Sequence, residues 1–120
     1  MTTLSNPVSV AVLKRAIEGR DAKGLTALYA DDAVVRIIDH ENPPSKPREL
    51  NGKQAIAGYY DDVCGRAMSH RIASAVTDGE ALSFTQICTY PDGAQVFCAA
   101  MLEISAGKIT RQTSVQAWDT

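Results

Sequence analysis

The chain is predicted to fold as one α+β domain, with helices in its first half and an antiparallel sheet in its second. Apolar residues follow helical spacing in much of the first half, and β-branched segments dominate the second. Three turn signals, at Asp78-Gly79, Asp92-Gly93 and Ala106-Gly107, divide the second half at regular intervals. The length of 120 residues fits a single domain spanning residues 1–120.

Three helices and a lone strand are expected in the first half. Asn6-Pro7 is typical of a helix start, with Asn as N-cap and Pro in the first turn of a helix that runs to about Gly19. Asp21 can cap a second helix, whose buried side is formed by Leu25, Leu28 and Tyr29. The β-branched segment 34–38 predicts a strand.

A loop and a third helix follow the lone strand. Three closely spaced prolines in segment 39–50 indicate a loop, since they exclude a helix and a central strand. Apolar and aromatic spacing then predicts a helix from Asn51 to about Met68, with an inner face of Ile56, Tyr59, Tyr60 and Val63. Four strands are expected at 70–77, 81–90, 95–104 and 108–118.

The hairpin turns predict which side chains share a face of the sheet. If both later turns contain two residues, one face combines large apolar side chains with amides, and the other carries small, smooth side chains. We interpret the first face as the wall of a ligand pocket beneath the helices. Its members are Phe84, Gln86, Cys88, Tyr90, Gln95, Phe97, Ala99, Met101, Gln112, Ser114, Gln116 and Trp118. The smooth face would suit packing against a second sheet.

The composition argues against several classes of function. A net charge of −2 offers no basic patch for nucleic acid or acidic lipid. No stretch approaches the ~20 apolar residues needed to span a bilayer, and the N-terminal sequence lacks the features of a secretory signal. The two histidines are not spaced to ligate a metal, and no glycine-rich loop indicates a nucleotide. We therefore expect a cytoplasmic protein with no cofactor.

The three cysteines are expected to be reduced. Their number is odd and no pair has C-x-x-C spacing. A two-residue turn at Asp92-Gly93 would set Cys88 opposite Phe97 and Cys98 opposite Ile87. The two thiols would then face opposite sides of the sheet, which argues against a disulfide.

Several segments together resemble the SnoaL-like branch of the nuclear transport factor 2 superfamily. These are ALYADDAVV, NGKQAIAGYYDDV, VTDGEALSF, AGKIT and a closing aromatic strand, which cover nearly the whole chain. The branch includes steroid delta-isomerases, limonene epoxide hydrolase and polyketide cyclases. The resemblance implies a cone of three helices over a curved, mostly antiparallel sheet with a pocket between them. It also implies a homodimer through the outer face of the sheet.

The catalytic residues of the steroid isomerases are missing from the matching positions of this sequence. An ungapped count from Tyr29 places the steroid-isomerase base at Ile37, and the family's acid on the penultimate strand falls near Ala99. The family's tyrosine on the first helix falls near Ala16 or Ile17. Steroid isomerisation by that mechanism is therefore not expected. Arg111, the arginine that an epoxide hydrolase would need, is expected to point away from the pocket.

Asp39 and His70 are the remaining candidates for catalysis. Alternation places Asp39 on the face of Ile37, where it could act as a general base, unless the strand has already ended and Asp39 is a solvated loop charge. His70 opens the first strand of the second half, and its face is undecided by the turn at Asp78-Gly79. His40 and Glu41 are expected to be solvent-exposed.

Two functions are compatible with this pattern. The first is a cofactor-independent isomerase, cyclase or hydrolase acting on a cyclic or polyketide-like carbonyl compound, with glutamines at the developing oxyanion. The second is a ligand-binding or dimerisation module without catalysis. Both would bind a hydrophobic or cyclic small molecule, and the predicted ligand contacts are Tyr59, Phe84, Gln86, Phe97, Met101, Gln112, Gln116 and Trp118.

Overall fold

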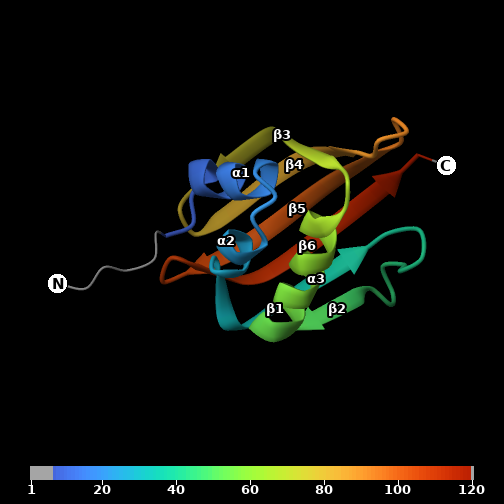
Figure 1. Cartoon of the computed structure of the whole chain (residues 1–120). Helices are drawn as coiled ribbons and strands as arrows, with labels where there is room; N and C mark the ends of the chain where they lie inside the picture. Colours follow the sequence, from blue (N-terminus) through green and yellow to red (C-terminus); the bar gives the residue numbers. More distant parts are fainter. Residues whose placement is uncertain (1–6, 120) are drawn as a thin grey trace.

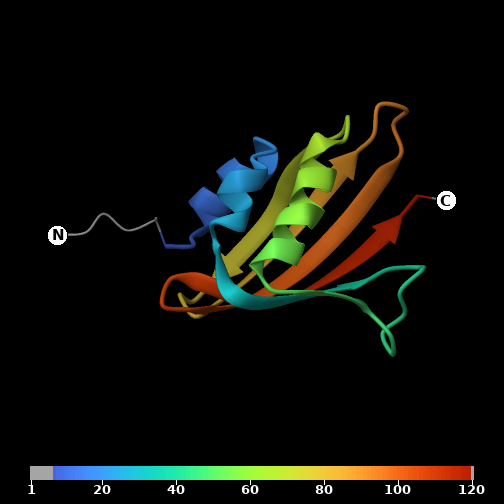
Figure 2. The ribbon, with the colours of Figure 1, turned by 60° about the horizontal axis from the view of Figure 1, so that its bottom comes forward.

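A curved six-stranded sheet with three helices on one face forms the protein, as the computed structural model of residues 7–119 shows (Figures 1 and 2). The strands are β1 (Tyr29–Ile38), β2 (Arg48–Asn51), β3 (Ser69–Thr77), β4 (Ala81–Thr89), β5 (Gln95–Ser105) and β6 (Lys108–Trp118). Their order is β2-β1-β6-β5-β4-β3, and only β1 and β6 are parallel neighbours. This confirms the predicted α+β class and the mostly antiparallel sheet.

The first helix starts later than expected. In α1 (Val10–Glu18) the Ser9 side chain is the N-cap and accepts a hydrogen bond from the Val12 N–H at 3.1 Å. Asn6, the predicted cap, lies outside the described residues. Pro7 precedes the helix and is not in its first turn. The next residue, Val8, is bonded to a distant part of the chain, since its N–H donates to the Gly107 carbonyl at 3.1 Å.

The second helix begins where the sequence predicts. In α2 (Ala22–Thr26) the Asp21 side chain accepts from the Gly24 N–H at 3.0 Å, which is the expected N-cap bond. One residue predicted for the buried side of this helix lies beyond its end, because Tyr29 belongs to β1. Tyr29 is nevertheless only 1% exposed and lies in the core.

The first strand is neither short nor alone. It pairs with β6 on one side and with β2 on the other, setting Val35 opposite Leu50. The strand β2 was not predicted from the sequence, because it is short and follows Pro47 directly. As an edge strand it tolerates the neighbouring proline. The third helix, α3 (Lys53–Gly65), follows immediately and lies across the sheet near β1 (Figure 1).

The four strands of the second half match their predicted ranges closely, but β5 has the opposite facing. The loop between β4 and β5 contains three residues, 91–93, since Tyr90 N–H bonds to the Ala94 carbonyl at 2.9 Å. Cys88 therefore pairs with Val96, and Gln86 pairs with Cys98. The expected two-residue turn was wrong, and the faces of β5 are exchanged relative to β4.

A second irregularity restores the expected face of β6. The turn at Ala106-Gly107 does contain two residues, with Ser105 opposite Lys108. A bulge then places Thr110 as an extra residue, because Ile104 pairs with Ile109 and Glu103 with Arg111. The inner faces of β4 and β6 thus agree with the prediction, whereas that of β5 does not.

The core lies between the helices and the inner face of the sheet. Its largest fully buried side chains are Tyr29, Ile56, Leu82, Leu102 and Ile109. A second, smaller cluster contains Met68, Cys88, Val96 and Cys98, with Tyr90 packed against it. Within residues 7–119, no helix has the length and apolar character required to cross a membrane.

Candidate functional site

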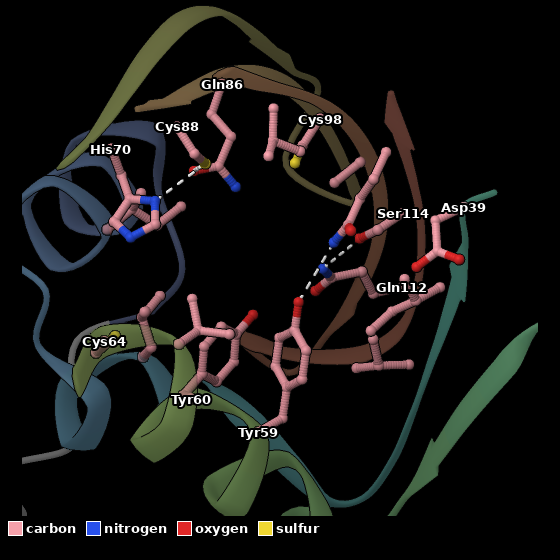
Figure 3. Close-up of a pocket in the computed structure, with 18 of the residues that line it drawn as sticks. Asp39, Tyr59, Tyr60, Cys64, His70, Gln86, Cys88, Cys98, Gln112 and Ser114 are labelled. Atoms are coloured by element: carbon pink, nitrogen blue, oxygen red, sulfur yellow. Dashed lines mark hydrogen bonds between the residues drawn. The ribbon is translucent and has the colours of Figure 1, made fainter. Parts of the chain in front are cut away.

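A cavity of about 270 Å³ lies between the helices and the inner face of the sheet. Its wall mixes core apolar side chains with tyrosines, glutamines and thiols. The polar or reactive members are Tyr29, Asp39, Tyr59, Tyr60, Cys64, His70, Gln86, Cys88, Cys98, Gln112, Ser114 and Gln116. Figure 3 shows the labelled side chains arranged around an open centre. The size is close to the lower end for small-molecule sites.

One wall holds a directional chain of hydrogen bonds. The Tyr29 hydroxyl donates to Oε1 of Gln112, so its single proton is already used. Tyr60 must therefore donate to Tyr29, across 2.6 Å between the hydroxyl oxygens. The Gln112 amide in turn donates to Oγ of Ser114 at 2.9 Å. Within residues 7–119 the Ser114 hydroxyl makes no other hydrogen bond, so its own proton remains free to donate to a ligand.

Tyr59 ends a second chain in the same way. Trp118 Nε1 donates to Oε1 of Gln116 at 3.2 Å, and Nε2 of Gln116 donates to the Tyr59 hydroxyl at 3.4 Å. Burial raises the pKa of Tyr59, so the hydroxyl keeps its proton at neutral pH. Tyr59 thus accepts from the protein and keeps an O–H to donate. The Arg48 guanidinium lies over the Tyr59 ring, 5.3 Å from its centre.

Gln86 presents a third donor to the cavity. Its Oε1 accepts from the Cys88 thiol at 3.5 Å, and within residues 7–119 its amide nitrogen makes no hydrogen bond. Figure 3 shows this nitrogen pointing toward the open centre. All three glutamines predicted for the pocket therefore line it, and two of them use both ends of the amide.

Asp39 lies at the edge of the cavity, directly after β1. Its Oδ1 accepts three hydrogen bonds, from the backbone N–H groups of Glu41 and Asn42 and from Nδ2 of Asn42, at 2.8–2.9 Å. Burial raises the pKa of Asp39, but these bonds outweigh that effect and hold the pKa below its ordinary value. Asp39 is therefore both a turn residue and a cavity residue, and it is ionised at neutral pH.

His70 lies on the far side of the cavity from Asp39 (Figure 3). Its Nδ1 is 3.0 Å from the Cys88 sulfur, and its Nε2 is buried without a hydrogen-bond partner in the described part of the chain. Cys98 lies beside Cys88 on the neighbouring strand, on the same face of the sheet. The structure thus brings His70 to the thiols and does not bring it to Asp39.

The predicted placement of the thiols was wrong in one respect. Cys88 and Cys98 share the inner face because of the three-residue loop before β5, whereas opposite faces were expected. All three cysteines are free. Cys88 and Cys98 are diagonal neighbours on adjacent strands and are not bridged. Within residues 7–119, no group of three or more His, Cys, Asp or Glu side chains is arranged to hold a metal ion.

Two predicted ligand contacts lie outside the cavity. Phe97 and Met101 are on the outer face of β5, with exposed fractions of 47% and 51%. The other predicted contacts, Tyr59, Phe84, Gln86, Gln112, Gln116 and Trp118, all line the cavity. The roles of Ser114 and of the Cys88–His70 contact were not recognised from the sequence. The contact between His70 and Cys88 could have been recognised from the correct pairing of β3 with β4, which sets these two residues opposite each other.

The likeness to solved structures is strong in fold and weak in sequence. A protein of unknown function from Burkholderia xenovorans, described as similar to nuclear transport factor 2, aligns with a TM-score of 0.76 at 14% identity. That alignment covers 92% of this chain and 81% of the other. A Kribbella flavida protein, provisionally described as a ketosteroid isomerase, gives 0.71 at 17% identity, covering 92% and 74%.

A third structure is IdmH from Streptomyces antibioticus, provisionally described as a polyketide cyclase. It gives a TM-score of 0.64 at 20% identity and covers 89% of this chain and 88% of its own. No curated protein matches the sequence. The model of the SnoaL-like domain family, however, matches residues 10–112. The chain therefore belongs to the SnoaL-like domain family.

Proposed function

We propose that the protein binds a mainly apolar, cyclic carbonyl compound in the cavity beneath α3. The observation that carries this proposal is the pair of free hydroxyl donors, Tyr59 and Ser114, in a wall that mixes apolar side chains with polar ones. A ligand that accepts hydrogen bonds but offers few donors matches such a wall. The isomerase and cyclase descriptions of the Kribbella and Streptomyces proteins agree with a ligand of this class.

A proton-transfer reaction of the bound compound is the catalytic form of this proposal. Asp39 is the candidate base, because its Oδ2 has no hydrogen-bond partner within residues 7–119 and the carboxyl lines the cavity. It would remove a proton α to the carbonyl group, while the hydroxyls of Tyr59 and Ser114 hold the developing enolate oxygen. His70 lies on the opposite side of the cavity from Asp39, and its contact is Cys88 (Figure 3).

A binding module without catalysis is the second candidate. The lowered pKa of Asp39 favours it, because a carboxylate that is strongly stabilised by hydrogen bonds is a weak base. The cavity remains available in this case, since Phe97 and Met101 lie outside it and do not fill it.

Deuterium exchange separates the two candidates without knowledge of the natural substrate. A panel of cyclic ketones and lactones is first screened for binding by NMR titration. Each ligand that binds is then incubated with the protein in D₂O, and exchange of its α-protons is followed. An enzyme accelerates this exchange above the buffer rate, and the D39N variant removes the acceleration. Binding with no acceleration by the native protein identifies the module, and no binding by any member refutes the proposal.

We also propose that the protein forms a homodimer through the outer face of its sheet, in the cytoplasm. This face carries exposed large apolar side chains, including Phe97, Met101 and Val115 at 41–51% exposure. The face is therefore rougher than the small-residue surface expected from the sequence, because β5 is reversed. The free thiols support a reducing compartment.

A further inference from the structure

One end of the cavity contains a cluster that the proposed function does not use. Gln86 and Cys88 are neighbours on the inner face of β4, His70 is opposite Cys88 on β3, and Cys98 is opposite Gln86 on β5. All four side chains line the cavity. Figure 3 shows His70, Gln86 and Cys88 facing Tyr59 and Tyr60 across the open centre.

The Cys88 sulfur lies among hydrogen-bond donors. Nδ1 of His70 is 3.0 Å away, and Cys98 lies on the same face of the neighbouring strand, diagonal to Cys88. The Nδ1–H tautomer of His70 donates to the sulfur and avoids an unpaired N–H at Nε2, which is buried. The Cys98 and His70 contacts outweigh burial and lower the pKa of Cys88, whereas the pKa of Cys98 is raised by its contact with Cys88 and by burial. Of the two thiols, Cys88 is therefore the one that ionises more readily, and on ionisation it gives up the bond that the neutral thiol donates to Oε1 of Gln86.

A carbonyl-binding donor lies directly beside this sulfur. Oε1 of Gln86 is 3.5 Å from the Cys88 sulfur, and the free amide nitrogen of the same side chain points into the cavity. A nucleophile next to an N–H donor fits a conjugated electrophile, in which the carbon attacked and the oxygen that gains charge are separated along one short chain. An α,β-unsaturated ketone or lactone has this arrangement.

We propose that Cys88 is a nucleophile that adds to the β-carbon of a cyclic α,β-unsaturated carbonyl compound bound in the cavity, with Gln86 holding the carbonyl oxygen. This inference rests on the proposed function and narrows its substrate class to enones. Cys88 and Gln86 touch the substrate. His70 and Cys98 are positioning residues, which act by stabilising the thiolate.

The addition conserves atoms and electrons with only the protein, the ligand and one solvent proton. A lone pair of the Cys88 thiolate forms the S–C bond to the β-carbon, and the π pair of the C=C bond moves to give an enolate. The enolate oxygen accepts from the Gln86 amide. The proton that the thiol lost on ionisation returns from solvent to the α-carbon, which completes a saturated thioether. The reverse steps release the ligand, so no oxidant or other reactant is required.

The test is labelling of the full-length protein with cyclohex-2-enone, followed by intact-mass and peptide mass spectrometry. We expect one equivalent at Cys88 and slower labelling when cyclohexanone is present as a competitor. Cys64 is a matched control in the same chain, because it also lines the cavity but burial raises its pKa. As pH falls from about 8 to 6, the labelling rate of Cys64 should fall about tenfold per unit, while that of Cys88 stays nearly constant.

Two variants separate positioning from structure. H70F should slow labelling of Cys88 about 10-fold at neutral pH, yet approach the native rate above pH ~9, where any thiol ionises. Q86M should slow labelling at every pH, because it removes the carbonyl donor and leaves the thiolate. If either variant fails to fold, the pH profile of the native protein still tests whether Cys88 ionises more readily than an ordinary thiol.

Three results would overturn the inference. They are labelling of Cys64 ahead of Cys88, a Cys88 rate with the pH dependence of an ordinary thiol, and labelling that cyclohexanone does not slow. Failure of the proposed function is read separately, from binding of saturated ketones. Ketone binding without Cys88 labelling removes this inference and keeps the proposed function. Absence of both refutes the two together.

Discussion

At the scale of single residues, the position of one proton decides the role of each tyrosine. Tyr59 and Tyr60 are adjacent on α3, and both line the cavity. The Tyr60 proton is used to reach Tyr29, whereas within residues 7–119 the Tyr59 hydroxyl only accepts. Tyr60 is therefore part of the structural network, and Tyr59 keeps a proton that the proposed ligand would accept.

Substitution of Tyr59 by Phe should weaken ketone binding about 5-fold, which corresponds to the loss of one hydrogen bond of about 1 kcal/mol. Isothermal titration calorimetry with a ketone from the binding panel measures the change. The matched variant Y60F should leave the affinity nearly unchanged and lower the free energy of unfolding by about 1 kcal/mol. Equal losses of affinity in both variants would contradict the assignment of donors.

The Asp39 carboxyl should titrate below its unfolded value of about 3.9. Since its native pKa is lowered, ionised Asp39 stabilises the fold above that value, and this contribution disappears as pH falls through the native pKa. The N42A variant removes the side-chain donor to Oδ1, keeps the two backbone donors, and should raise the pKa toward normal. Carboxyl NMR titration measures both proteins. An unchanged pKa in N42A would show that the backbone bonds alone determine it.

Single-residue roles were only partly predictable. The glutamines and Tyr59 were found because their side chains stand out on an otherwise apolar face. Ser114 was placed on that face, but a serine draws no special interpretation until its partner Gln112 is known to use it as an acceptor. The contact between His70 and Cys88 joins two strands, and the face of His70 was undecided from the sequence.

At the scale of elements, the turn signals predicted the limits of the later strands correctly, but not the facing of every strand. Ranges for β3 to β6 were close to correct because Gly-containing turns separate them. The reversal of β5 came from reading Asp92-Gly93 as the whole turn. Pro91 indicates the longer loop, since its fixed φ suits the first turn position, and the Gly93 N–H bonds to the Tyr90 carbonyl at 2.9 Å.

Gly93 should be sensitive to substitution. Its φ of +92° lies in the left-handed region, where a side chain costs about 1–2 kcal/mol. G93A should lower the free energy of unfolding by about that amount in urea denaturation. The matched variant G58A lies within α3, where an added Cβ meets no atom within 4 Å, and should raise it by about 0.5–1 kcal/mol. A stability change of the same sign in both variants would show that backbone conformation does not distinguish the two glycines.

At the scale of the whole molecule, the two faces of the sheet differ in character. Its inner face, covered by the helices, carries the cavity, and its outer face carries exposed apolar side chains. The class of fold was predictable from helix and strand order. The depth of the cavity was not, because it depends on how far the helices stand from the curved sheet.

The proposed dimer can be tested by one charge on the outer face. M101K should convert a dimer to a monomer in sedimentation velocity, because a lysine at this position would be buried without a partner. The control Q54K adds the same charge on the exposed side of α3 and should leave the mass unchanged. A native protein that sediments as a monomer would exclude the dimer directly.

The extra residue at Thr110 and the three-residue loop at 91–93 also bear on how relatives should be aligned with this chain. Each can lose one residue while every strand pair on either side is kept, so homologues are expected to differ in length at these two points. A gap-free comparison that crosses one of them shifts by one position and exchanges inward for outward residues. The acid expected near Ala99 shows the effect. Ala99 pairs with Thr85 and Val115 and faces outward, whereas the inward neighbours are Cys98 and Ala100. A shift of one position moves this comparison from Ala99 to Cys98 or Ala100, and Cys98 is the diagonal neighbour of Cys88.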